Sequence, residues 1–350
     1  MIAREVDAAP DIGVRNSQPE GIGRLVCLGD LVCWNNLGRN VVFADRQLRP
    51  RAVFGSTLFP GQDEPSQYDL DVHAIIDERD LRCVLVLNHL GTIRGFRSAD
   101  LLRLRGLRAV EPTLLWSFSA DVERTVLAGG RLIGSRPRSE GAPGLLVSAP
   151  LATLSDEGSI PTQPDGERFG EVTALGVVPS PAGPLIAVGG DGRLALAPLV
   201  GDRFASPRWV ADVGFRVASI EWHRDALWAA GPERVGVVDD YDWEQLKGGG
   251  FAALDPVDGA TLACGPLPPD VAWGAGGVAV VPFGRLVAAA GRAGRLYLID
   301  PRNPAGNRST DSLSDGPSLG IAHMAVVGRR VVYGFNRGGY GLHSAQPRKA

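Results

Sequence analysis

The chain has 350 residues, of which 44% are hydrophobic and 21% are charged, which is enough apolar material for one large domain or two ordinary ones. The net charge of −3 gives no general attraction to nucleic acid or to an anionic membrane surface. The 46 glycines and 26 prolines follow no collagen period, so they indicate many turns and not disorder.

The N-terminal segment lacks the features of a targeting signal. Arg4, Glu5 and Asp7 occupy the region where a signal peptide needs an apolar core. The longest uncharged apolar stretch, residues 271–284, is too short and too rich in glycine to span a bilayer. We therefore expect a cytoplasmic protein without membrane insertion, and partners that are proteins and not nucleic acids.

Paired short strands recur along the whole chain. The clearest unit is EVTALGVVPSPAGPLIAVGGDGRLALAP (171–198), which predicts a strand, a Pro/Gly turn, a second strand, a tight turn at Asp191-Gly192 and a third strand. Hairpins of this kind are predicted to start near residues 30, 81, 124, 184, 226, 285 and 330. An apolar strand precedes most of them, at residues 72–76, 113–118, 217–222, 277–281 and 321–327.

Seven such units, spaced by roughly 40–60 residues, have the period of a β-propeller. The predicted fold class is therefore all-β, with seven blades of four antiparallel strands in a single domain that spans residues 1–350. The last unit has little chain left for a fourth strand. We expect the N-terminal segment, residues 1–18, to supply the closing strand of this last blade.

Three segments carry a family resemblance. Residues 171–198 resemble a WD40-type repeat, although the Trp-Asp dipeptide and the Gly-His start of that family are both missing. Residues 250–259 (GFAALDPVDG) and 295–301 (RLYLIDP) are similar to blades of PQQ-like propellers, whose outer strand often ends in Leu-Asp before a turn with glycine. The resemblance implies a propeller architecture and transfers no active site, because fold alone does not define function.

Two stretches interrupt the repeat and are candidate functional segments. Residues 135–170 predict one strand and an exposed loop, and a tolerated surface insertion is the simpler interpretation. Residues 239–250 (DDYDWEQLKGGG) place Tyr241, Asp242 and Trp243 before a glycine triplet, where acids and aromatic rings could contact a cation, a basic partner segment or a sugar. The alternative is a plain loop with Trp243 tucked beneath it.

The hairpin turns are the second candidate contact surface, because turns of this kind gather at one face of a propeller, around the mouth of its channel. Turn geometry alone already favours Asn, Asp and Gly at such positions, so a purely structural role is the alternative. The polar residues predicted at these turns are Asn35, Asn36, Asn88, His89, Asp191, Glu233, Arg292, Asn336 and Arg337.

No cofactor or metal is predicted. His73 and His323 fall in the first strands of their units and His223 ends one. These histidines could form a metal centre on the axis, but structural roles are the preferred interpretation. The four cysteines form no CxxC pair and are expected to be reduced and buried. The arginines of residues 92–108 are expected to protect an outer strand edge, with docking of an acidic partner as the alternative.

The sequence contains none of the GxSxG, HExxH or phosphate-binding glycine motifs. We therefore predict a non-catalytic binding or scaffold propeller that mediates protein–protein interaction. The alternative is an enzyme, such as a lactonase, a lyase or a hydrolase, with or without assistance from a metal ion, and with its site at the mouth of the central channel.

Overall fold

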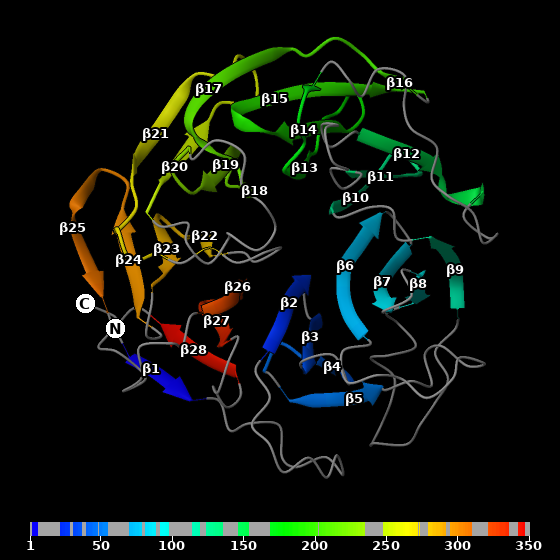
Figure 1. Ribbon diagram of the computed structural model, residues 1–350, viewed down its shortest axis with the longest axis horizontal. Coiled ribbons are helices and arrows are strands. Elements are labelled where there is room, and N and C mark those ends of the chain that lie inside the picture. The colour runs from blue at the N-terminus through cyan, green and yellow to red at the C-terminus, as the bar shows by residue number, and fades with distance from the viewer. Residues whose placement is uncertain are drawn as a thin grey trace. The chain divides into compact units, whose positions relative to one another are not determined.

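The described elements of the computed structural model are almost all β-strands (Figure 1). The chain divides into two compact units, each described by itself below. The first unit comprises Met1–Ser117, Ala290–Tyr297 and Arg308–Ala350, and the second comprises Phe118–Ala289 and Leu298–Asn307. The residues that the structure describes are 2–5, 22–28, 31–36, 40–47, 49–54, 70–78, 81–88, 92–97, 114–119, 124–135, 146–153, 169–201, 203–234, 248–271, 273, 279–291, 295–309, 321–335 and 342–346.

Three sheets of four described strands lie in the first unit, in the orders β2-β3-β4-β5, β6-β7-β8-β9 and β26-β27-β28-β1. Strands β26, β2 and β6 are the first strands of their sheets, and β2 packs against both of the others. The strands are β1 (Ile2–Glu5), β2 (Ile22–Leu28), β3 (Leu31–Asn36), β4 (Asn40–Ala44), β5 (Pro50–Phe54), β6 (Leu70–Glu78), β7 (Leu81–Asn88), β8 (Thr92–Arg97), β9 (Leu114–Ser119), β26 (Ile321–Val327), β27 (Arg330–Phe335) and β28 (Leu342–Gln346).

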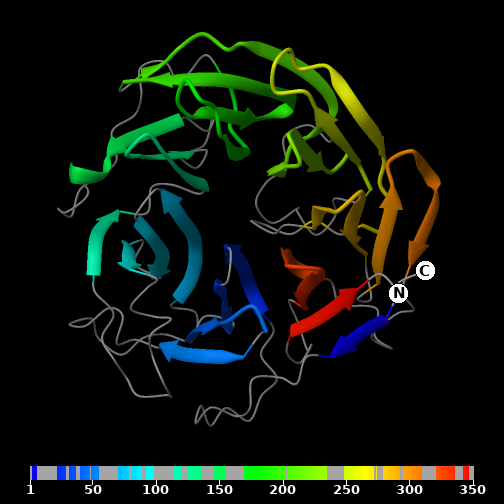
Figure 2. The ribbon, with the colours of Figure 1, turned by 180° about the vertical axis from the view of Figure 1, so that it is seen from behind.

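The two ends of the chain share one of these sheets. Strand β1 pairs antiparallel with β28, so that Ile2 lies opposite Gln346 and Glu5 lies opposite His343 (Figure 2). The strand that the sequence analysis placed within residues 1–18 is therefore Ile2–Glu5, and it is the outermost strand of its sheet.

Four further sheets lie wholly or mostly in the second unit, in the orders β10-β11-β12, β13-β14-β15-β16 with β17 also on β15, β18-β19-β20-β21 and β22-β23-β24-β25. A short 3-10 helix, η2 (Leu151–Thr153), follows β12. The strands are β10 (Arg124–Ala128), β11 (Arg131–Ser135), β12 (Leu146–Pro150), β13 (Ala174–Val178), β14 (Leu185–Gly189), β15 (Asp191–Val200), β16 (Arg203–Phe204), β17 (Trp209–Arg216), β18 (Ser219–His223), β19 (Ala226–Gly231), β20 (Gly250–Leu254), β21 (Thr261–Pro266), β22 (Val280–Phe283), β23 (Leu286–Ala290), β24 (Leu296–Asp300) and β25 (Asn303–Ser309).

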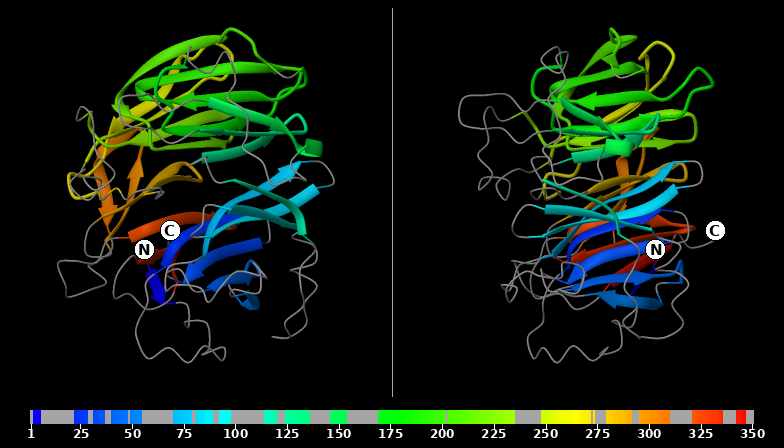
Figure 3. Two further views of the ribbon diagram at one scale, coloured as in Figure 1. Left: turned by 45° about the vertical axis from the view of Figure 1, so that its right-hand side comes forward. Right: turned by 90° about the vertical axis from the view of Figure 1, so that its right-hand side faces the viewer.

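The core of the second unit lies between successive sheets, since one buried cluster joins residues of the sheet that contains β15 with residues of the β18–β21 sheet. Figure 3 shows the strands of the second unit from two further sides. Strand β13 packs against β10 and β18, and β18 packs against β22. Every residue of β14 and β20 is buried, whereas the outer strand β21 alternates between exposed and half-buried positions. Sheets covered on both faces need apolar residues on both faces of their inner strands, which explains the runs LIAVG and GFAAL.

Two features of the repeat differ from the prediction. The predicted first strand at residues 113–118 is β9, the last strand of the β6–β9 sheet, so the next sheet begins at β10. The hairpin predicted to start near residue 226 was expected to end near residue 240. In the structure β19 pairs with β20 (Gly250–Leu254) instead, and residues 235–247 lie outside the described part of the chain. Similar apolar strands at the first and last positions of a sheet cannot be told apart by periodicity, which accounts for the first error. The second error has another cause: a hairpin is predicted from strands that are close in sequence, whereas β19 and β20 are separated by residues 232–249.

The prediction of four strands in each blade is also wrong for two sheets. Among the described residues, the β10–β12 sheet has three strands and the sheet that contains β15 has five. Strand β15 is ten residues long, so its first half pairs with β17 and its last residues, Leu199 and Val200, pair with β16. A single long strand thus supports two partners on one edge.

The turn between β18 and β19 is strained. Arg224 and Asp225 have φ values of 50° and 59°, the left-handed region that side chains with a Cβ disfavour. We expect the double replacement R224N/D225G, which supplies the residues preferred in a type I′ turn, to raise the free energy of unfolding by about 0.5–1 kcal/mol. Urea denaturation measures this gain.

A neighbouring turn provides the control. Arg285 follows Gly284, and in that turn only the glycine has a positive φ among its described residues. The replacement R285G should therefore give no gain and lose up to about 1 kcal/mol, because glycine adds backbone entropy to the unfolded chain. Equal stabilisation by both changes would contradict the assignment of strain to Arg224 and Asp225.

Candidate functional site

Asp191 is the candidate contact residue that the structure describes most fully. For Asn35, Asn36 and Asn88 it describes the backbone alone, in strands β3 and β7. Glu233 is described and forms an isolated bridge with Phe215. The other candidates lie outside the described residues: Tyr241, Asp242, Trp243, His89, Arg292, Asn336 and Arg337.

The tight turn predicted at Asp191-Gly192 is confirmed. The N–H of Gly190 donates to the carbonyl oxygen of Arg193 over 2.9 Å, and Gly192 has a φ of +78°. The sheet register shifts between Asp191 and Arg193, which is a β-bulge against β17. Asp191 therefore stands at a turn that is fixed by hydrogen bonds on both sides.

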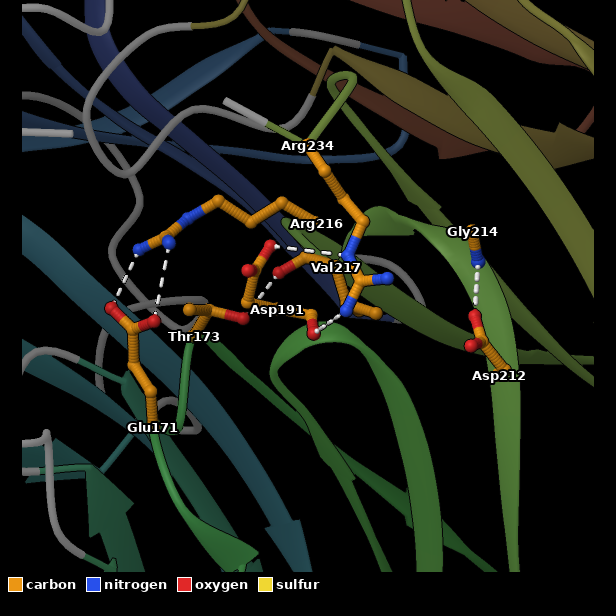
Figure 4. Close-up of polar contacts among 8 residues, drawn as sticks. All are labelled: Glu171, Thr173, Asp191, Asp212, Gly214, Arg216, Val217 and Arg234. Carbon is orange, nitrogen blue, oxygen red and sulfur yellow. Dashed lines mark hydrogen bonds and ion pairs between the residues drawn. The ribbon is translucent and has the colours of Figure 1, made fainter. Parts of the chain in front are cut away.

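The guanidinium of Arg234 covers this turn (Figure 4). Its Nη2 donates to the carbonyl oxygen of Asp191 over 2.8 Å, and its Nε lies 3.8 Å from Oδ1 of Asp191. A Cβ at Gly192 would come within 2.1 Å of the Cζ of Arg234, so the position accepts only glycine while Arg234 lies there. The two charged side chains remain 45% and 38% exposed, so they are held in place and still face solvent.

A second ion pair lies beside the first and is more buried. Arg216 donates Nη2–H to Oε1 of Glu171 over 2.8 Å and Nη1–H to Oε2 over 3.2 Å, a bidentate geometry (Figure 4). The side chain of Arg216 is 8% exposed and that of Glu171 is 24% exposed. We refer to Glu171, Asp191, Arg216 and Arg234 together as the polar cluster.

Hydrogen bonds to backbone carbonyl groups fix the segments that carry the polar cluster. The hydroxyl of Thr173 donates to the carbonyl oxygen of Val217 over 2.5 Å, and the N–H of Val217 donates to the carbonyl oxygen of Gly190 over 3.0 Å. The segment before β13, the turn before β15 and the link from β17 to β18 are thereby joined. Two carboxylates and two guanidiniums balance in charge, and such a preorganised set is suited to recognition of polar groups on a partner.

Sequence reasoning found Asp191 and missed its three partners. Arg216 was missed because the chain carries many arginines and most are expected to be solvated. The available signal was its position directly after Phe215 at the end of an apolar strand, since a buried arginine needs a charged partner. No pattern in the sequence identifies Glu171 as that partner, because the two residues are 45 positions apart and meet only once the sheet that contains β13 and β17 has formed.

The histidines occupy the strands that were predicted. His73 and His323 lie in the first strands β6 and β26, and His223 ends β18. His223 donates its Nε2–H to the carbonyl oxygen of Gly284 over 3.2 Å, since a carbonyl can only accept. Within the described residues there is no group of three or more His, Cys, Asp or Glu side chains that could hold a metal ion.

The cysteines differ in part from expectation. Cys33 is buried, and burial, with a smaller effect of nearby Cys27, raises the pKa of its thiol. Cys264 is exposed on the outer strand β21, where burial was predicted. Three of the five arginines singled out in residues 92–108, at positions 103, 105 and 108, lie outside the described residues, whereas Arg94 and Arg97 belong to β8.

Comparison with known proteins identifies the fold. No protein-family model and no curated protein sequence matches the chain. Among solved structures, it is similar to Raptor from Chaetomium thermophilum, with a TM-score of 0.63 and 13% identity over 95% of this chain and 29% of that one. It is also similar to BamB from Moraxella catarrhalis, with a TM-score of 0.56 and 11% identity over 100% and 99% of the two chains.

A third similar structure is the WD40 β-propeller domain of Doa1, with a TM-score of 0.56 and 10% identity over 95% of each chain. No helix in the described part of this chain has the length and apolarity needed to cross a bilayer. Likeness at this level of identity concerns the fold alone, and it agrees with the WD40-like and PQQ-like patterns in the sequence: the chain has an all-β, β-propeller fold.

Proposed function

We propose that this chain is a non-catalytic propeller module of the cytoplasm that binds a protein partner, and that its sheets form seven blades of one ring. The three sheets of the first unit and the four of the second support this blade number. The WD40 domain of Doa1 is a structural neighbour, and domains of that type commonly serve in protein recognition. The partner is neither nucleic acid nor a membrane.

The observation that carries the proposal is the fixed position of Arg234 and Asp191 at the surface. Both side chains are exposed, yet the hydrogen bond from Arg234 to the Asp191 carbonyl holds the guanidinium in one place. A charged group ordered before binding loses less entropy when a partner contacts it. The contact surface would continue over the predicted turn residues and over Tyr241, Asp242 and Trp243.

The test is affinity capture from the source organism with three proteins: wild type, R234E and a control, R308E. Arg308 is exposed on the outer strand β25 of another sheet, so R308E makes the same charge change without altering the polar cluster. We expect wild type and R308E to retain the same protein at equal stoichiometry. That protein, once purified, should bind R234E about tenfold more weakly, because an acidic group of the partner that pairs with Arg234 would be repelled by the reversed charge.

The fold should survive the change, since exposed ion pairs contribute less than about 1 kcal/mol. Thermal unfolding of R234E provides this check. Equal retention by all three proteins, or the absence of any stoichiometric partner, would reject the surface around Asp191 and Arg234 as the contact site.

A further inference from the structure

The guanidinium of Arg234 lies flat on the turn that it covers. A Cβ built on Gly192 would stand 2.1 Å from Cζ of Arg234 and 2.3 Å from both Nε and Nη2. Such similar distances to the central carbon and to two of its nitrogens occur only for an atom above the guanidinium plane. One face of this planar group is therefore turned to the Cα of Gly192.

Asp191 occupies one edge of the same group. Nη2 of Arg234 donates to the carbonyl oxygen of Asp191 over 2.8 Å, and Nε lies 3.8 Å from Oδ1 of the side chain (Figure 4). These contacts and the covered face hold the guanidinium in one orientation. The side chain of Arg234 is nevertheless 45% exposed, and the groups left to solvent are the opposite face and the Nη1 end.

The open face of Arg234 has the properties of a stacking surface. Among the described residues no aromatic ring contacts Arg234, and its hydrogen bond and ion pair are those to Asp191. The five N–H bonds of a guanidinium lie in its plane, so its face forms no hydrogen bond with water. This weakly hydrated, positively charged face attracts the negative face of an aromatic ring.

We propose that an aromatic side chain of the protein partner, from Phe, Tyr or Trp, stacks on the open face of Arg234. This inference rests on the function proposed above and names the chemistry of the contact. Because Arg234 is ordered before binding, stacking costs little side-chain entropy. An acidic group of the partner would meet the Nη1 end instead, so one partner can make both contacts.

The first test needs no identified partner. It uses N-acetyl-tryptophanamide as the probe and N-acetyl-leucinamide as the control without a ring. NMR of isotope-labelled protein follows the Nε–H signals of the arginines, assigned by their loss in R234K and R308K. A stacked ring shifts the signal of the guanidinium beneath it upfield.

We expect an upfield shift at Arg234 that grows with the concentration of N-acetyl-tryptophanamide and is at least about twice the shift at the exposed Arg308. Equal shifts at the two arginines overturn the proposal, as does an equal response to N-acetyl-leucinamide. Because this test does not involve the partner, its result is independent of whether the proposed function holds.

The second test uses the partner obtained by affinity capture. The variant R234K keeps the positive charge and removes the plane, so it should bind the purified partner about fivefold more weakly than wild type, while R308K binds like wild type. If R234E binds weakly and R234K binds like wild type, Arg234 contributes charge alone. That result overturns the stacking contact and leaves the proposed function in place, whereas failure to retain any partner rejects the proposed function.

The variant G192A displaces the guanidinium without changing any charge. Its Cβ would occupy the place of the guanidinium, so Arg234 has to leave the turn. The matched control is G284A, because Gly284 has a φ of +65° and no atom within 4 Å of a built Cβ. Alanine meets similar backbone strain at both positions, and only at Gly192 does it move Arg234.

We expect G192A to lose as much affinity for the partner as R234K does, and G284A to bind like wild type. Thermal unfolding checks that both variants are folded. Replacement of one aromatic residue of the partner by leucine should likewise weaken binding to wild type and have little further effect on binding to R234K, because both changes remove the same contact. Wild-type affinity in G192A, or additive effects at every aromatic position of the partner, overturns the proposal.

Discussion

The replacement G231A is expected to prevent folding or to lower the free energy of unfolding by more than about 4 kcal/mol. A Cβ at Gly231 would stand 1.5 Å from the carbonyl oxygen of Arg216, 2.6 Å from its carbon and 3.0 Å from the nitrogen of Ala218. All three atoms belong to the backbone, so no side chain can move to make room. Soluble yield and urea denaturation followed by circular dichroism measure the effect.

Relief of the clash would separate the end of β19 from the link between β17 and β18. That movement would break two backbone hydrogen bonds, from Arg216 N–H to the carbonyl of Pro232 over 3.0 Å and from Ala218 N–H to the carbonyl of Ala230 over 2.9 Å. The loss therefore combines steric strain with unsatisfied buried groups, each costing about 1–3 kcal/mol.

Glycines in open positions provide the control. Gly130 and Gly284 have φ values of +72° and +65°, and no atom lies within 4 Å of a Cβ built on either. The variants G130A and G284A should each lose only about 1 kcal/mol, the cost of a left-handed backbone for alanine. A G231A protein as stable as these two would contradict the close approach described here.

The replacement R216M carries the second largest expected effect, a loss of about 3 kcal/mol in the free energy of unfolding. Methionine retains much of the apolar stem, so the change mainly removes the guanidinium that pairs with both oxygens of Glu171. The carboxylate is then left half-buried without its cation. Because Glu171 keeps 24% of its side-chain surface exposed, we place the value at the lower end of the range for buried pairs.

A double-mutant cycle separates the pair from its surroundings. With R216M, E171M and the double variant, the coupling energy should reach about 1.5 kcal/mol or more, since the double variant buries no unpaired charge. The variant R234M is the matched control, because Arg234 and Asp191 are exposed and their charged atoms lie 3.8 Å apart. It should change stability by less than about 1 kcal/mol, and a larger effect than that of R216M would reverse the ranking of the two pairs.

The sequence predicted the local elements of the fold better than their grouping. Alternating apolar runs and turn residues predicted hairpins such as β3–β4, β10–β11 and β27–β28, because register and turn chemistry are local properties. The assignment of residues 113–118 to the wrong sheet shows the limit. A short apolar strand fits the inner or the outer position of a sheet equally well, and only tertiary packing decides between them.

The candidate site was less predictable than the fold. The turn at Asp191-Gly192 was recognised, since Asp-Gly is a strong hairpin signal. Its cover, Arg234, is 43 residues away, and the bond from Arg216 to Glu171 spans 45 residues. Contacts between residues so far apart in the chain come from the tertiary fold, which a single sequence does not encode in any local pattern.

The pairing of β1 with β28 has a consequence for synthesis of the chain. Ile2 is synthesised well before its partner Gln346, which follows on the order of 20–70 s later at bacterial or eukaryotic elongation rates. Throughout that interval the edge of the nascent N-terminal strand has no partner and is open to other strands. We therefore expect chaperones that shield exposed β-edges to affect the yield of this protein more than its final stability.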